Sequence, residues 1–169
     1  SEMCIRDSKL AGSAYTLEQI ITAGIENCKR ACAPYGALTA LDVGPLGELL
    51  EPSGTLAFED AVAEYARIVK AGEAAGADLI FFETYTDLYE LKAALLAAKE
   101  NTHLPILASM SFEAGGRTFT GCTVESFAAT ARGLGADAVG INCSSFCIRS
   151  GCAARNDRTR PVVPLPGGR

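Results

Sequence analysis

Hydrophobic residues along this chain form two alternating kinds of pattern, which predict buried strands and helices in turn. Short segments rich in apolar residues lie at 37–43, 79–82, 105–110 and 135–143. Such segments are typical of strands that are covered on both faces, as in parallel sheets. Between them, apolar residues recur every three or four positions, which predicts amphipathic helices. Strands that alternate with helices in this way predict an α/β fold with a parallel sheet.

Each predicted helix begins after a residue that can cap its free amide groups. The predicted caps of the four helices are Thr16, Thr55, Asp87 and Thr123. Gln19 and Glu90 stand three residues after Thr16 and Asp87, where a side chain can complete a capping box. These polar positions therefore mark where the chain leaves a loop and enters a helix.

Two of the predicted strands open and close with matching residues. Gly-Ala-Asp occurs at 76–78 and again, 59 residues later, at 135–137. Glu83 and Asn142 then occupy the same position at the two strand ends, and Cys143 follows Asn142. The offset matches two units of a barrel built at roughly 30 residues per strand and helix. Because sites in such folds collect at the carboxyl ends of parallel strands, we expect these three side chains to lie together.

Composition limits the partners and the compartment. The 169 residues are 49% hydrophobic and 21% charged, as in a globular domain. A net charge of −5 argues against nucleic acid or an anionic membrane surface as a partner, and no apolar run is long enough to span a bilayer. The seven cysteines are an odd number, and Cys28 and Cys32 lie in a predicted helix. This pattern argues against a disulfide framework and predicts a cytoplasmic protein.

The alternating pattern covers the middle of the chain. Residues 1–8 have no periodicity, and we expect a leader that is not native to the domain. Residues 9–145 carry four strand–helix units, whereas a complete eight-unit barrel needs about 250 residues. Residues 146–169 lack a helical apolar face, and the prolines within 161–165 argue against a central strand. We therefore expect an aberrant or truncated tail, and a chain that is a fragment of a larger barrel.

Four motifs, in order, resemble the homocysteine S-methyltransferase family. They are Leu-Asp-Val-Gly-Pro-Leu-Gly at 41–47, the strand at 78–84 with the helix start at 87–94, Gly-Arg-Thr-Phe-Thr-Gly at 116–121, and Gly-Ile-Asn-Cys-Ser at 140–144. The resemblance spans about residues 13–145 and is closest to the homocysteine-binding barrel of the cobalamin-dependent methionine synthases. It implies a partial (β/α)8 TIM barrel, about strands three to six of the eight.

The resemblance also implies an activity. A methyl group would pass to the thiol of homocysteine and give methionine, with methylcobalamin as the methyl carrier. Cobalamin- and folate-binding modules would lie elsewhere in the same parent chain. A catalytic zinc would be held by three cysteines, of which Cys143 is one. The other two form an adjacent pair in a Gly-Gly-Cys-Cys-Gly motif that this sequence lacks, so we expect the fragment alone to be inactive and to bind no stoichiometric zinc.

Each candidate site residue also has a plainer structural interpretation. Cys143 could be a small buried residue at a strand end. The resemblance assigns Glu83 to the amino group of homocysteine, whereas the residues alone equally allow an ion pair with a neighbouring loop. Asn142 could orient the substrate or tie adjacent loops together. Asp42 could touch the substrate or organise the loop at 44–47.

Two other functional classes stay open at this point. One is a catalytically inert half-barrel with exposed apolar edges, and the other is an unrelated α/β small-molecule-binding domain of flavodoxin-like topology. His103 precedes a predicted strand on the amino-terminal side of the sheet, where a solvated loop residue is expected. Cys147 and Cys152 have a spacing that fits no standard zinc site.

Overall fold

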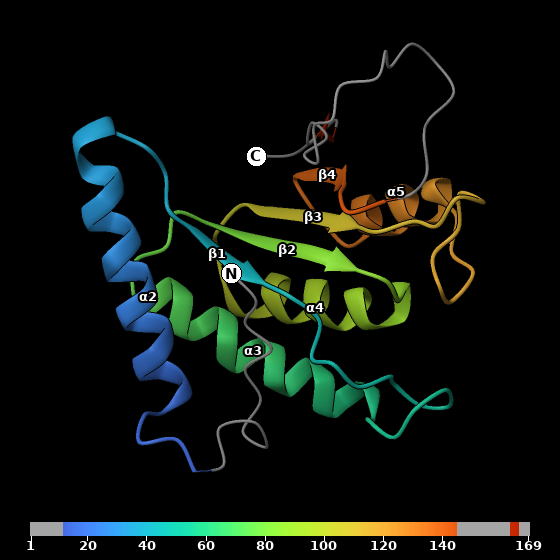
Figure 1. Ribbon diagram of the computed structural model, residues 1–169, viewed down its shortest axis with the longest axis horizontal. Coiled ribbons are helices and arrows are strands. Elements are labelled where there is room, and N and C mark those ends of the chain that lie inside the picture. Colours follow the sequence, from blue (N-terminus) through green and yellow to red (C-terminus); the bar gives the residue numbers. More distant parts are fainter. Residues whose placement is uncertain (1–11, 145–162, 166–169) are drawn as a thin grey trace.

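A computed structural model describes residues 12–144 and 163–165 of the chain (Figure 1). The predicted leader at 1–8 and most of the predicted tail, with Cys147 and Cys152, lie outside these residues. Four strands form a parallel sheet in chain order: β1 (Ala40–Val43), β2 (Leu79–Tyr85), β3 (Ile106–Met110) and β4 (Ala138–Ile141). The predicted parallel α/β architecture is therefore confirmed.

One more strand lies beside β4. β5 (Val163–Pro164) is two residues long and pairs antiparallel with β4, at the edge of the sheet. Proline has no N–H to donate to a ladder, and an edge strand is where a sheet tolerates it. Pro164 is thus compatible with pairing at an edge and not with a place in the middle of the sheet.

Among the described residues, one helix precedes the first parallel strand and three others connect successive strands. They are α2 (Leu17–Cys32), α3 (Phe58–Ala74), α4 (Leu88–Asn101) and α5 (Val124–Gly133), and a short 3-10 helix, η1 (Ala33–Tyr35), follows α2. Figure 1 shows α3 and α4 side by side along one face of the sheet, and α2 lies against α3. Among the described residues, none of the helices combines the length and the apolar character required to cross a membrane.

Three of the four predicted caps are present. The Thr16 hydroxyl accepts a hydrogen bond from the backbone N–H of Gln19, and the Gln19 side chain accepts one from the N–H of Thr16, which confirms the capping box. Asp87 and Thr123 also accept backbone N–H groups at the starts of α4 and α5. Each cap satisfies a donor that has no partner inside its helix.

The predicted cap at Thr55 is wrong. Helix α3 begins at Phe58, and Ala57 stands at its cap position without a side-chain hydrogen bond. The reason lies in the preceding loop, where Leu56 forms a bridge with Leu50 and holds this stretch extended. Both leucines are buried, so their packing outweighs the local preference of a threonine to start a helix.

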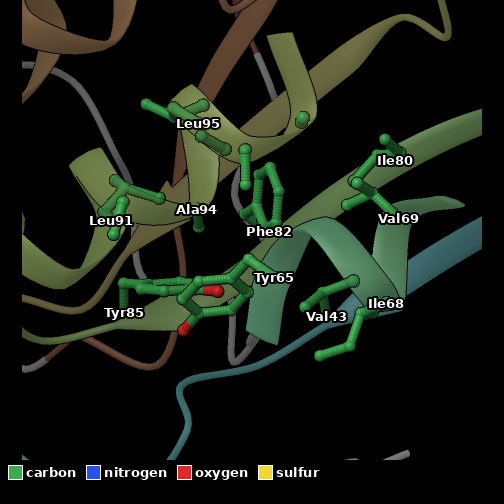
Figure 2. Close-up of a cluster of buried hydrophobic side chains, with 14 of the residues drawn as sticks. Val43, Tyr65, Ile68, Val69, Ile80, Phe82, Tyr85, Leu91, Ala94 and Leu95 are labelled. Atoms are coloured by element: carbon green, nitrogen blue, oxygen red, sulfur yellow. The ribbon is translucent and has the colours of Figure 1, made fainter. Parts of the chain in front are cut away.

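The hydrophobic core lies between the sheet and the helices α3 and α4. Within β2, Ile80 and Phe82 are completely buried, whereas the alternate residues Phe81 and Glu83 are partly exposed on the other face. Figure 2 shows the cluster on the helix side, whose labelled members are Val43, Tyr65, Ile68, Val69, Ile80, Phe82, Tyr85, Leu91, Ala94 and Leu95. This packing fixes which face of each strand is free to carry polar side chains.

The repeated Gly-Ala-Asp segments have one structural role. Gly76 and Gly135 follow α3 and α5 with φ angles of 85° and 83°, in the left-handed region that glycine enters readily. The next aspartate then accepts a backbone N–H from the start of a neighbouring strand, at 2.7 Å for Asp78 and 2.9 Å for Asp137. Each repeat ends a helix and ties the following strand into the sheet.

Candidate functional site

The ends of β2 and β4 bring together Glu83, Asn142 and Cys143. The Nδ2 atom of Asn142 lies 3.3 Å from Oε1 of Glu83 and 3.7 Å from Sγ of Cys143. These residues come from parallel strands on either side of β3, so their carboxyl ends point to the same rim of the sheet. An acid, an amide and a thiol therefore meet at the place where sites collect in α/β folds.

The Asn142 amide is the centre of a larger polar network. Its Nδ2 donates to the Thr84 hydroxyl at 2.6 Å, and its Oδ1 accepts from the Ser109 hydroxyl at 3.0 Å. The Ser109 oxygen in turn accepts the backbone N–H of Thr84 at 3.3 Å. Residues from β2, β3 and the end of β4 are thus joined through side chains as well as through the sheet.

Two residues at this rim have a left-handed backbone without being glycine. The φ angles are 64° at Thr84 and 48° at Cys143, which are matching positions of the 59-residue repeat. A β-branched residue such as threonine rarely adopts this conformation, and such strain is concentrated at functional sites. The turn at Thr84 also shifts the register of β2, and Tyr85 lies on the helix side, buried against Tyr65.

Asp42 adds a second carboxyl group to the free face of the sheet. It is paired in register with Phe81, so its side chain lies on the same face as that of Glu83. Burial, and then the negative charge of Glu83, raise the pKa of Asp42 to about 6. A hydrogen bond between the two carboxyl groups contributes to the same shift. Two carboxyl groups in this arrangement favour a positively charged partner, such as an ammonium group.

Cys143 is exposed, which contradicts the interpretation of a small buried residue at a strand end. The Ser111 hydroxyl donates to its carbonyl oxygen at 2.9 Å and helps to hold this backbone. In the part of the chain that the structure describes, no three His, Cys, Asp or Glu side chains lie close enough together to hold a metal ion. These residues therefore offer one sulfur ligand and not a complete zinc site.

Glu90 has a role that the sequence did not reveal. It was expected to close a capping box, but its carboxylate is buried and accepts the N–H of Leu46 at 2.7 Å and the hydroxyl of Tyr65 at 2.9 Å. Tyr85 donates to the carbonyl of Gly44 at 3.2 Å. Together these contacts hold the loop that follows Asp42. Glu90 therefore stabilises this loop from the buried side of the sheet and does not cap α4.

Sequence reasoning also missed Ser109 and Thr84. Ser109 is a hydroxyl inside an apolar run, and it is 1% exposed. A polar residue at a position that must be buried was the available signal, because such a group needs a hydrogen-bond partner. Nothing in the sequence marked the left-handed backbone of Thr84. His103 is exposed, and its N–H donates to Glu73, as expected of a loop residue.

Comparisons with known proteins agree on one family. A family model described as homocysteine S-methyltransferase matches residues 4–155. Methionine synthase of Mycobacterium tuberculosis is 33% identical over 75 residues, and that of Mycobacterium leprae is 32% identical over 75 residues. Each match covers 41% of this chain and 6% of the relative. The chain thus spans a small part of the length of these curated relatives.

A solved structure has the same fold. The homocysteine methyltransferase MmuM from Escherichia coli, in its apo form, superposes with a TM-score of 0.67 at 22% sequence identity. The superposition covers 85% of this chain and 54% of the other. The sheet and helices described above therefore correspond to about half of a homocysteine methyltransferase fold of the TIM-barrel type.

Proposed function

Because the chain belongs to the homocysteine S-methyltransferase family, we propose that its parent protein transfers a methyl group to the thiol of homocysteine and forms methionine. The observation that carries this proposal is the contact of the Asn142 amide with both Glu83 and Cys143. The Asn142 side chain contacts the Glu83 carboxylate, which can bind the ammonium group of an amino acid. It also contacts the Cys143 thiol, which lies where the sulfur end of the substrate is proposed to bind. This pairing matches the two ends of homocysteine.

Glu83 is proposed to bind the ammonium group of the substrate. Its carboxylate is partly buried, where an ionic hydrogen bond is stronger than in water. Asp42 lies on the same face and adds negative charge, which favours a cation between the two strands. In this proposal Asn142 orients both ends of the site, since its amide donates toward the Glu83 carboxylate and toward the sulfur of Cys143.

The thiol of homocysteine must lose its proton, because the thiolate is the nucleophile. We propose that Cys143 is one ligand of a zinc ion in the parent protein, with two further cysteines that the described residues do not supply. When bound, zinc supplies a positive centre that favours the thiolate over the thiol. The contribution derived for this chain is one exposed sulfur, held in place by the left-handed turn at Cys143.

The methyl donor in this proposal is methylcobalamin, carried on modules of the same parent chain together with a folate-binding module. The homocysteine thiolate, which has already lost its proton, forms the new sulfur–carbon bond, and the bond between the methyl carbon and the donor breaks with its electron pair left on the donor. A protein of this activity with free cysteines fits a reducing compartment, and we place it in the cytoplasm.

The substitution Glu83→Gln in the full-length protein tests the proposal. It keeps the shape of the side chain and removes the charge that binds the ammonium group. Losing one charge-assisted hydrogen bond is expected to raise KM for homocysteine roughly 10- to 100-fold, with kcat much less affected. Glu113→Gln, an exposed glutamate in the turn after β3, is the matched control and should leave KM unchanged.

Two results contradict the proposal. One is an unchanged KM in the Glu83→Gln variant, which removes Glu83 from the substrate site. The other is failure of the unsubstituted full-length protein to methylate homocysteine with any methyl donor, which removes the activity itself.

A further inference from the structure

Ser109 is a buried polar residue in the middle of the candidate site. It lies on β3, between the strands that carry Glu83 and Asn142, and its side chain is 1% exposed. A buried hydroxyl group is costly unless it makes hydrogen bonds. Here the hydroxyl donates to Oδ1 of Asn142 at 3.0 Å and accepts the backbone N–H of Thr84 at 3.3 Å. Its hydrogen-bonding capacity is therefore used within the site.

These contacts select one orientation of the Asn142 amide. The NH2 end of the amide faces Oε1 of Glu83 at 3.3 Å and the Thr84 hydroxyl at 2.6 Å, and it can only donate hydrogen bonds. The carbonyl end then faces Ser109, whose hydroxyl proton is available because its oxygen accepts from the N–H of Thr84. A donor at one end and an acceptor at the other thus hold the amide in place.

We propose that Ser109 is a positioning residue for homocysteine binding, acting through the Asn142 amide to set the spacing between Glu83 and Cys143. This inference rests on the proposed function. The carboxylate binds one end of the substrate and the thiol lies at the other, so their separation must match the length of homocysteine. Without the Ser109 hydroxyl, Oδ1 of Asn142 loses its donor, and the amide is held only by the contacts of its Nδ2 with the Thr84 hydroxyl and Glu83, which leave its carbonyl end free to move.

Steady-state kinetics of Ser109→Ala in the full-length protein tests the inference. Loss of one well-placed hydrogen bond is expected to raise KM for homocysteine about tenfold, with kcat within about twofold of the unsubstituted protein. A KM within about twofold of the unsubstituted value overturns the inference.

Thr102→Val is the matched control. Thr102 is 8% exposed and donates its hydroxyl to the carbonyl of Ala98 at 3.0 Å, before β3 begins and at the opposite end of the sheet. The variant loses the same kind of buried hydrogen bond with nearly the same side-chain shape. Its KM should stay unchanged, and an equal rise in both variants means that Ser109 has only a structural role.

A double-mutant cycle asks whether Ser109 acts through Asn142. In an Asn142→Ala background, Ser109→Ala should change KM by no more than about twofold, because the group that it positions is already absent. A second tenfold rise on top of the first means that the two residues act independently, and this outcome overturns the inference.

Two further arms keep the test decisive. If Ser109→Ala does not fold, Ser109→Cys keeps the shape with a much weaker donor and should raise KM at least about threefold, whereas an unchanged KM overturns the inference. A crystal structure of the folded variant is independent of activity. It should show the Asn142 amide moved away from Glu83, and an amide still 3.3 Å from Oε1 overturns the inference even if the proposed activity itself proves wrong.

Discussion

Asp42 makes the stability of the protein depend on pH. Burial and the charge of Glu83 raise its pKa from 3.8 to about 6. A carboxyl group with a raised pKa favours folding while it is protonated, so its contribution is complete below pH 4 and is lost as the pH rises through 6. Asp42→Asn removes this loss. We expect the variant to be more stable than the unsubstituted protein by about 1 kcal/mol at pH 7, less than the full shift implies because the carboxyl group is partly exposed.

Urea unfolding at pH 4 and at pH 7 measures this difference. At pH 4 the two proteins should have the same midpoint, because Asp42 is then protonated in the folded state. Glu113→Gln removes a negative charge from an exposed side chain and is the control. Its stability relative to the unsubstituted protein should not increase from pH 4 to pH 7. A lower stability of Asp42→Asn at pH 7 contradicts the raised pKa.

Whether a site residue could be predicted from the sequence depended on its position at the end or in the middle of a strand. Glu83, Asn142 and Cys143 could be placed at one rim because each follows a buried apolar run, and parallel strands end on the same side. The signal at Ser109 was incomplete, because a single hydroxyl in an apolar strand indicates a buried hydrogen bond but does not identify its partner until the neighbouring strands are known. The left-handed turn at Thr84 was hidden, since it depends on contacts from β3 and β4.

At the scale of elements, the loop after β1 is held by α3 and α4. Burial raises the pKa of Tyr65 well above 10, so its hydroxyl stays protonated and donates to Glu90 at all ordinary pH values. We expect Tyr65→Phe to lower the free energy of unfolding by about 1–2 kcal/mol, because the buried Glu90 carboxylate loses one of its donors. Urea unfolding measures the loss.

Tyr35→Phe is the matched control for Tyr65→Phe. Tyr35 is 85% exposed, so removing its hydroxyl should change the free energy of unfolding by less than about 0.5 kcal/mol. Equal stability of the two variants would show that the hydroxyl of Tyr65 contributes nothing to holding the loop, and the interpretation of Glu90 as its anchor would then be wrong.

Elements could be predicted where local signals and packing agree. The alternation of strands and helices, and the caps at Thr16, Asp87 and Thr123, follow from short-range chemistry. The two local errors have a common cause. Thr55 and Glu90 each had a plausible capping role. A bridge between Leu50 and Leu56, and a hydrogen bond from the buried Tyr65, decided the outcome, and both depend on packing and not on the local preference of the residue.

At the scale of the whole molecule, metal binding needs more ligands than the described residues bring together. Cys143 offers one sulfur, whereas zinc sites in proteins use three or four protein ligands. We expect the 169-residue chain, purified by itself, to hold less than about 0.1 zinc per chain and to be inactive. Elemental analysis measures this ratio. A longer protein that includes a Cys-Cys pair should hold about one zinc and lose it in Cys143→Ser. One tight zinc in the 169-residue chain contradicts this expectation.

The open sheet of the described residues predicts self-association of the 169-residue chain. Among the described strands, β1 pairs with β2 alone and so leaves an edge open to another chain. Phe81 and Leu107 are register partners on the free face, and both are partly exposed. We expect dimers or larger species in size-exclusion chromatography with light scattering, because an apolar face of this kind is stabilised by contact.

Replacing the two apolar residues tests whether self-association depends on the free face of the sheet or on exposed apolar residues elsewhere. The double substitution Phe81→Ser and Leu107→Ser should shift the chain toward monomer, since it removes apolar area from the free face without touching the core on the helix side. Phe119→Ser is the control, because Phe119 is 72% exposed in the turn region after β3 and does not lie on the sheet. A monodisperse monomer of the unsubstituted chain contradicts this expectation, because a sheet that needs no partner must already have its free face and edge covered.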